Sequence, residues 1–507
     1  MTIAVFAVWI TMVVLLVRKQ APLDATPLSD ATALDLPPTS DVTAEASATS
    51  GDATAPQAGA GAREEWFSVR QSGKKIGWAR RSTERTAEGR VLREDASFTL
   101  AMLGVPQTIR TAMVAHTDEA WALRSFEFTL LSPATRFKAS GTTDGRTLHV
   151  RYGADGTDKT SDLPLTEPIH LPTTLRPRIA QRHPADGARF TANVFSPLTL
   201  ENEPLTLVVE GHETIAGPDG PTDVLRIAEE HQGVRARAWL AADGSVVREE
   251  ATLGFTLERA TAETAYAGID RDTPVDITLA SRIPVAGEIR NPRDASSLSL
   301  RVSGAAASRI PDDPPRQTVR DGRLRIARET LPDGLPPGLP PSGADDAAVA
   351  TYLDPSPFIE SDDPAIVGTA RAIVGRERDP VRAAQKLLDW VSQNLVQEPT
   401  MTVPSARAVL AARRGDCNEH AVLLTALARA AGIPARVAAG AMYGDDGFFY
   451  HAWSELWLGR WVSADAVFRQ MPADVTHVKL IEGGPDRHLA LADVVGQLSF
   501  TAEEGGS

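Results

Sequence analysis

The chain of 507 residues contains a single cysteine, Cys417. One thiol cannot form a disulfide within the chain, and it cannot supply a metal site built from several cysteines. The usual structural reasons for a cysteine are therefore excluded. Two interpretations remain, a small buried apolar side chain or a reactive group.

The sequence also lacks the motifs of several functional classes. It has no phosphate-binding loop, no dinucleotide-binding fingerprint and no paired metal-ligand motif, so we expect neither a cofactor nor a metal ion. The chain has 52 basic and 66 acidic residues, a net charge of −14, a pI near 5.3 and no evident basic patch. A nucleic-acid partner is therefore not expected.

The N-terminus predicts attachment to a membrane. Residues 1–19 contain an apolar run over 2–17 followed by Arg18 and Lys19, which is typical of a membrane anchor. Residues 20–62 are rich in alanine, threonine, proline and serine, with six acidic residues and no basic ones, and predict a disordered spacer. The two basic residues favour a cytoplasmic location by the positive-inside rule, whereas the spacer favours the outer face. We expect a single-pass inner-membrane protein whose globular part is periplasmic.

The rest of the chain predicts an α+β protein of several domains, because 42% apolar residues suffice for substantial cores. Alternating apolar patterns separated by turns predict a β-rich domain over 63–268. A second strand cluster, which includes Val275, Ile277 and Leu279, and a stiff linker rich in proline and glycine predict a small β domain over 269–345. Asp-Pro pairs at 363–364 and 379–380 predict helix starts within a third domain, 346–507.

The surroundings of Cys417 favour the reactive interpretation. A helical pattern over 405–410 is expected to stop at Gly415, and a second helix follows at once. Asp416 is a good N-cap, and Glu419 stands three residues later in capping-box spacing. Cys417 therefore falls in the first helical turn, where unpaired N–H groups and the helix dipole favour the thiolate and lower the thiol pKa.

A β-hairpin follows downstream, with strands predicted over 450–458 and 461–465. In the first strand, the two-residue period places His451 and Trp453 on one face. A two-residue turn would place Asp465 on the opposite face from His451, whereas a three-residue loop over 458–460 pairs Asp465 with Trp453, diagonal to His451 on the same face. We predict the three-residue loop.

These segments, 415–420, 451–455 and 461–465, resemble the transglutaminase-like cysteine enzymes in sequence and in order. The resemblance covers about residues 350–495 and implies a papain-like α+β core with Cys417, His451 and Asp465 as the catalytic residues. Family members often carry proline after the aspartate, where this chain has Ala466, which affects the expected local turn.

The implied chemistry is acyl transfer through a thioester. His451 would take the thiol proton, Asp465 would orient the imidazole, and the Cys417 backbone N–H would bind the oxyanion. The partner would be a protein or peptide substrate, and the acceptor an amine (transglutaminase-like activity) or water. A cysteine peptidase or amidase with the same residues, and a non-catalytic protein-interaction module, remain alternatives.

Other conspicuous residues near these motifs have structural explanations. Trp390 is expected to be a core aromatic and His420 to support a loop. Glu419 is explained by helix capping. Trp453 is expected to pack beside Asp465 and shield the site from water.

Overall fold

The computed structural model describes residues 63–503, with gaps at 103–104, 134–135, 155–157, 219, 232–233, 272, 277–281, 399–404, 445, 484–490, 492–493 and 495–496. The predicted anchor and spacer lie outside the described residues, as do Ile277 and Leu279. Within the described part of the chain, no helix is long and apolar enough to cross a bilayer.

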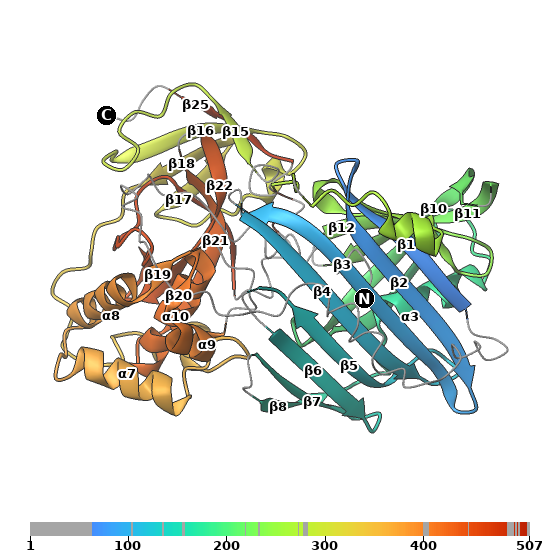
Figure 1. Ribbon diagram of the computed structural model, residues 1–507. Coiled ribbons are helices and arrows are strands. Elements are labelled where there is room, and N and C mark those ends of the chain that lie inside the picture. The colour runs from blue at the N-terminus through green and yellow to red at the C-terminus, as the bar shows by residue number, and fades with distance from the viewer. Residues whose placement is uncertain are drawn as a thin grey trace, which may run out of the picture.

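The first region is a curved antiparallel sheet of 14 strands, drawn in blue to green in Figure 1. Its strands run in the order β8-β7-β6-β5-β4-β3-β2-β1-β14-β13-β12-β11-β10-β9, so the first and last strands pair at its centre. The strands are β1 Arg63–Gln71, β2 Lys74–Thr86, β3 Gly89–Met102, β4 Val105–Thr117, β5 Leu123–Leu131, β6 Arg136–Thr143, β7 Thr147–Ala154, β8 Lys159–Pro164, β9 Arg189–Ser196, β10 Glu201–Gly217, β11 Gly220–His231, β12 Val234–Leu240, β13 Val246–Glu250 and β14 Phe255–Ala260.

Sequence alternation explains this sheet. In β4, Ile109, Met113 and Ala115 are buried while Arg110 and His116 are exposed, as expected when one face covers a core. Short helices complete the region; they are α3 Pro172–Ala180, η1 Thr252–Gly254 and α4 Ala262–Tyr266.

Helix α3 carries a buried arginine that pairs with the sheet. Arg176 donates to Glu229 on β11 at 2.7 and 2.9 Å and to Glu249 on β13. Arg81 on β2 donates to Glu94 at 2.9 Å and lies 3.4 Å from Glu249. Since a buried charge is tolerated only when it is paired, this network ties the helix to both halves of the sheet.

The second region combines a nine-stranded mixed sheet with helices. Its strand order is β17-β18-β16-β25-β15-β22-β21-β24, and β23 pairs with β22. The strands are β15 Ile283–Ala286, β16 Ser297–Ser303, β17 Gln317–Arg320, β18 Arg323–Ala327, β21 Ala435–Tyr443, β22 Gly447–Trp457, β23 Trp461–Ala464, β24 His477–Glu482 and β25 Ser499–Ala502. Strands from the predicted small β domain thus share a sheet with the strand that carries His451. The domain boundaries themselves stay predictions.

Helices α7 Pro364–Val374, α8 Pro380–Asn394, α9 Ala406–Ala412 and α10 Cys417–Ala430 gather below and beside β21 in Figure 1. The other helices of this region are η2 Ala307–Arg309, α6 Ala347–Ala350 and η3 Thr351–Leu353, and a two-stranded sheet joins β19 Val396–Gln397 to β20 Arg414–Gly415. The predicted starts of α7 and α8 are confirmed, because Asp363 and Asp379 cap them and proline follows.

Helix α10 is the central helix of this region. It packs against α7, α8, α9, β21 and β22, and the side chains from Cys417 through Ala428 are all buried. Trp390 on α8 is half-buried and packs against the same core, as expected, with the Arg413 guanidinium 4.4 Å from its ring centre. The start of α10 is therefore held by packing on several sides.

Candidate active site

Cys417 is the first residue of α10, as predicted. The Asp416 carboxylate accepts a hydrogen bond from the Asn418 backbone N–H at 3.0 Å, and the Glu419 carboxylate accepts one from the Asp416 N–H at 2.9 Å. Both halves of the capping box are therefore present, and they fix the direction in which the chain enters the helix.

The predicted end of the preceding helix was wrong. Helix α9 ends at Ala412, and Arg413 takes the left-handed conformation (φ 57°) while its N–H bonds to the Val409 carbonyl at 2.9 Å. Gly415 instead pairs with Gln397 in the short parallel sheet. Its lack of a side chain makes room for Glu419, because a Cβ at Gly415 would lie 2.3 Å from the Glu419 Cβ. This glycine therefore serves the capping box and not the end of α9.

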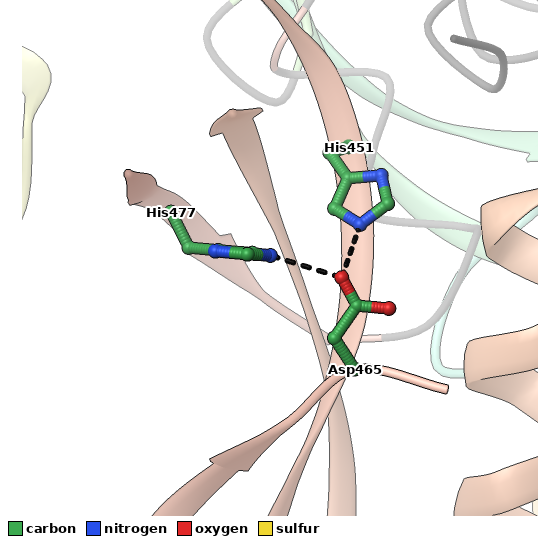
Figure 2. A group of neighbouring side chains, drawn as sticks. All are labelled: His451, Asp465 and His477. Atoms are coloured by element: carbon green, nitrogen blue, oxygen red, sulfur yellow. Dashed lines mark hydrogen bonds and ion pairs between the residues drawn. The ribbon is translucent and has the colours of Figure 1, made fainter. Parts of the chain in front are cut away.

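The three-residue hairpin loop is confirmed. Trp457 pairs with Trp461 and Ser454 with Ala464, which leaves residues 458–460 as the loop. Continuing this register sets Asp465 beside Trp453, on the face of β22 that carries His451. The carboxylate and the imidazole meet there, with His451 Nε2 2.7 Å from Asp465 Oδ2 (Figure 2).

This contact determines which nitrogen of the His451 imidazole carries the proton. Asp465 is fully buried, and burial alone would raise the pKa of its carboxyl group. The charge and hydrogen bond of His451, and then those of His477, outweigh burial and hold the pKa of Asp465 well below its usual value of 3.8. Since Nε2 donates its proton to this carboxylate, the neutral imidazole keeps an unprotonated Nδ1 that can act as a base.

Cys417 lies against β22 at the residue that follows His451. Strand β22 pairs with β21 along its length, but on its other edge β15 covers only Gly447 and Phe448, and β23 begins at Ser454. Among the residues that the structure describes, neither strand pairs with residues 449–453. The Ala452 backbone N–H donates a hydrogen bond to the Cys417 sulfur, so the sulfur lies beside the residue that follows His451.

Side-chain contacts hold α10 against the other face of β22. The Ser454 hydroxyl donates to the Ala421 carbonyl at 3.0 Å and lies 3.0 Å from the Thr425 hydroxyl. The Tyr450 hydroxyl donates to the Asn418 amide oxygen at 3.1 Å. These contacts fix the position of the start of α10 along β22.

The expected lowering of the Cys417 pKa was wrong. Burial raises the pKa of the Cys417 thiol well above its ordinary value, and the negative charges of Asp416, Glu419 and Asp465 add to this effect. Burial also lowers the pKa of His451, against the opposing influence of Asp465. Together these shifts favour a neutral thiol beside a neutral imidazole.

Sequence reasoning missed two residues of this cluster. His477, the first residue of β24, places its Nε2 2.9 Å from the same Asp465 oxygen (Figure 2). Its Nδ1 faces Asp474. No motif or spacing marks His477, because it reaches the site only through the pairing of β24 with β21. The one hint in the sequence is that Asp474 and His477 stand three residues apart.

The supporting residues behave largely as expected. His420 Nδ1 donates to the Asp416 carbonyl at 2.7 Å, and burial lowers the pKa of His420, so it braces the loop before the helix. Trp453 is buried, with its ring 6.4 Å from His451 and 5.2 Å from His477. It therefore packs against both imidazoles of the cluster.

The cluster of His451, Asp465 and His477 also has the composition of a metal site, since their ligand atoms lie within 4.8 Å of one another. Here, however, both imidazoles contact one carboxylate oxygen at hydrogen-bond distance. A nitrogen that donates a proton cannot also bind a metal. The arrangement fits a hydrogen-bonded cluster better than a metal centre.

The fold and the site define a class, an α/β domain with a cysteine at a helix start and a histidine–aspartate pair on the adjoining sheet. Residues 367–466, which include Cys417, His451 and Asp465, match the model of the transglutaminase-like superfamily. The chain therefore contains a transglutaminase-like domain that follows a β-rich N-terminal region in the sequence. The resemblance predicted from the sequence is confirmed. A comparison with curated proteins finds no match.

Solved structures show weaker similarities. A β-barrel-like domain of unknown function from Brucella abortus has 11% identity and a TM-score of 0.32, covering 39% of this chain and 95% of its own. A protein from Cytophaga hutchinsonii described as a candidate cysteine protease has 19% identity and a TM-score of 0.27, covering 44% and 84%. With TM-scores below 0.5, neither similarity bears on the function of this chain.

Proposed function

We propose that this protein is a thiol acyl-transfer enzyme that forms a thioester at Cys417 on a carboxamide or peptide substrate. The observation that carries the proposal is the buried hydrogen bond from His451 Nε2 to Asp465, 2.7 Å long, on a strand whose Ala452 N–H contacts the Cys417 sulfur. In this arrangement we assign His451 Nδ1 as the base that takes the thiol proton.

The proposed reaction has two halves. His451 Nδ1 takes the Cys417 proton, the sulfur attacks the carbonyl carbon, and His451 returns the proton to the departing ammonia or amine as the C–N bond breaks. An amine or water then gives a proton to His451 and attacks the thioester, and the released thiolate recovers that proton. Asp465 stabilises the imidazolium that exists between these transfers.

The protonation states support a general-base mechanism over a resting ion pair. Burial raises the pKa of Cys417 and lowers that of His451, so the thiol keeps its proton until substrate arrives. Cys417 and His451 are each 3% exposed and Asp465 is fully buried, which keeps bulk water away from the charges that form. The Cys417 backbone N–H, in the first turn of α10, is the proposed oxyanion donor.

Mass spectrometry of a glutamine-containing peptide tests the proposal. Incubation with a primary amine is expected to yield the amine adduct, and incubation without it a deamidated peptide, about 1 Da heavier because NH₂ is replaced by OH. Cys417→Ala should abolish both products, and Cys417→Ser should lower the rate by several orders of magnitude while the fold persists. Equal product from wild type and Cys417→Ala would refute the proposal.

The alternatives give different products in the same experiment. Peptide fragments that depend on Cys417 would identify a cysteine peptidase, whose chemistry differs only in the amide bond attacked. No product, together with a cellular phenotype that survives Cys417→Ala, would identify a non-catalytic interaction module.

The location is a separate proposal. We propose that residues 1–19 anchor the protein in the inner membrane and that 20–62 hold the globular part away from it on the periplasmic side. Protease added to spheroplasts should then degrade the globular part while the membrane stays intact. Protection until the membrane is lysed would place it in the cytoplasm.

A further inference from the structure

We infer that His477, held by Asp474, is a positioning residue that fixes the Asp465 carboxylate and, through it, the orientation of His451. The catalytic meaning of this inference rests on the proposed function, whereas its geometric part can be tested without any substrate.

The Asp465 carboxylate is held on both of its oxygens. Oδ2 accepts from His451 Nε2 at 2.7 Å and from His477 Nε2 at 2.9 Å (Figure 2). Oδ1 accepts from the backbone N–H groups of Val467 and Phe468 at 2.8 and 3.3 Å. The backbone contacts hold one oxygen, and His477 is the side chain that keeps the other aimed at His451.

His477 is itself held in place. Its Nδ1 lies 3.2 Å from the Asp474 carbonyl oxygen and 3.3 Å from the Asp474 carboxylate. Arg293 and Thr476 hold that carboxylate, through a guanidinium contact of 3.0 Å and the Thr476 backbone N–H at 2.9 Å. A continuous hydrogen-bonded chain therefore runs from Asp474 through His477 and Asp465 to His451.

The charges agree with this role. Burial alone would lower the pKa of His477, but the hydrogen bonds and charges of Asp465 and Asp474 outweigh it and raise that pKa. The other charged groups around the cluster are His451, Arg293, which pairs with Asp474, and Arg316, which donates to the backbone carbonyls of Asp474 and His477. A protonated His477 donates from both nitrogens, and the ionised Asp465 also accepts the hydrogen bond from His451 Nε2.

A purely structural histidine would fill the same space. Its ring packs edge-on against His451, with centroids 5.4 Å apart, and against Trp453 at 5.2 Å. The two roles differ in what a substitution does to the His451 tautomer, because packing needs only volume whereas positioning needs an N–H donor.

Two substitutions of His477 separate these roles. His477→Leu keeps apolar volume and removes the donor, while His477→Gln keeps an N–H donor and removes the charge. We expect ¹⁵N NMR of the full chain to show His451 as the Nε2–H tautomer in wild type and His477→Gln, and as a tautomer mixture in His477→Leu. The rate of Cys417 alkylation by iodoacetamide at neutral pH should fall about tenfold in His477→Leu and recover most of that loss in His477→Gln, as expected for one hydrogen bond to a charged group.

The matched control is His170→Gln. His170 is also buried and donates from Nδ1 to a backbone carbonyl, that of Trp121, but it lies in the N-terminal region. The His170→Gln substitution should change neither the His451 tautomer nor the rate of Cys417 alkylation. An unchanged tautomer or an unchanged alkylation rate in His477→Leu overturns the inference, and so does equal behaviour of the Leu and Gln variants.

If His477→Leu does not fold, Asp474→Asn carries the test. It keeps the shape of the side chain but weakens the hold on His477 Nδ1, so the pKa of His477 should fall and the His451 ring resonances should shift. Unchanged His451 resonances would overturn the inference. Failure to form any thioester would instead refute the proposed function, because the tautomer comparison needs no substrate.

Discussion

At Cys417, two physical effects act on the thiol in opposite directions. Its place in the first turn of α10 favours the thiolate through the helix dipole. Burial, with the nearby carboxylates of Asp416 and Glu419, favours the neutral thiol and is the larger effect. The sequence indicates the first effect, because capping residues are local, but burial depends on how α10 packs against β22.

The pH profile of Cys417 alkylation should report this balance. We expect a midpoint above the value of about 8.5 typical of a free thiol. Asp416→Asn should move the midpoint down, because it removes the second-largest cause of the raised pKa while asparagine still caps the helix. Asp379→Asn, the same change at the cap of α8, should leave the midpoint unchanged. A wild-type midpoint at or below 8.5 would mean that the dipole prevails over burial.

The cluster around Asp465 should make stability depend on pH in two directions. The pKa values of Asp465 and Asp474 are depressed, so their contribution is present above 3.8 and is lost as the pH falls. The pKa of His477 is raised, so its contribution is complete below 6.5 and is lost as the pH rises through its folded value. Taken together, Asp465, Asp474 and His477 therefore stabilise the fold most between these two values.

Urea unfolding of wild type and His477→Gln at several pH values tests this window. The difference in free energy of unfolding should be largest near pH 5, between the ordinary values of 3.8 and 6.5, and should shrink in alkaline solution. His212→Gln, at a side chain that is 59% exposed, should differ from wild type by less than about 0.5 kcal/mol throughout. A difference that grows with pH would show that His477 is neutral in the folded protein.

Among secondary-structure elements, those governed by neighbouring residues were predictable. The cap of α10 follows from Asp416 and Glu419. The odd length of the 458–460 loop follows from the two-residue period of a strand, if Asp465 is to share a face with His451. The interrupted edge of β22 was not predictable, because it depends on where β15, some 160 residues earlier in the chain, stops pairing. Within the described residues, this unpaired stretch of β22 is where the Ala452 N–H contacts the Cys417 sulfur.

The close contact at Gly415 gives a prediction at the scale of one element. Gly415→Ala should destabilise the protein by roughly 2–4 kcal/mol, because the new Cβ would meet the Glu419 side chain at 2.3–2.4 Å and displace the capping box. Gly375→Ala, at a positive φ of 61° with no atom within 4 Å, should cost only about 1–2 kcal/mol. Urea denaturation followed by circular dichroism measures both, and equal losses would show that backbone conformation, and not the contact, determines the cost.

For the whole molecule, the order of a β-rich region followed by an α/β region was predictable from composition and alternation. The pairing of β1 with β14, and the joining of β15–β18 to the sheet that carries His451, were not. Such pairings are set by packing between distant segments, which one sequence does not display. Among the described residues, no strand or helix of 63–266 packs extensively against one of 283–502.

The two regions should therefore unfold separately. Named contacts between the regions and their connection include Lys159 to Glu360 at 2.8 Å, with the lysine side chain 30% exposed, and the Ala101 N–H to the Val275 carbonyl at 2.8 Å. The Glu360 side chain of this ion pair is only 4% exposed, but water screens the lysine end, so the pair contributes on the order of 1 kcal/mol. Contacts of this kind couple the two regions only weakly.

Arg176→Met tests this independence, and the lone cysteine makes the test possible. The substitution leaves Glu229 buried without its arginine and removes one of the two arginines that contact Glu249, so it should destabilise the N-terminal sheet by roughly 3–5 kcal/mol. Arg189→Met, on the same sheet but 60% exposed, should cost less than about 1 kcal/mol.

Two signals followed in urea report the two regions. In Arg176→Met, the midpoint of hydrogen exchange in β10–β13 should move to a lower urea concentration, while the midpoint for exposure of Cys417 to a thiol reagent stays at its wild-type value. Because Cys417 is the only thiol in the chain, its exposure reports the second region alone. An equal shift of both signals would show that the two sheets unfold as one cooperative unit.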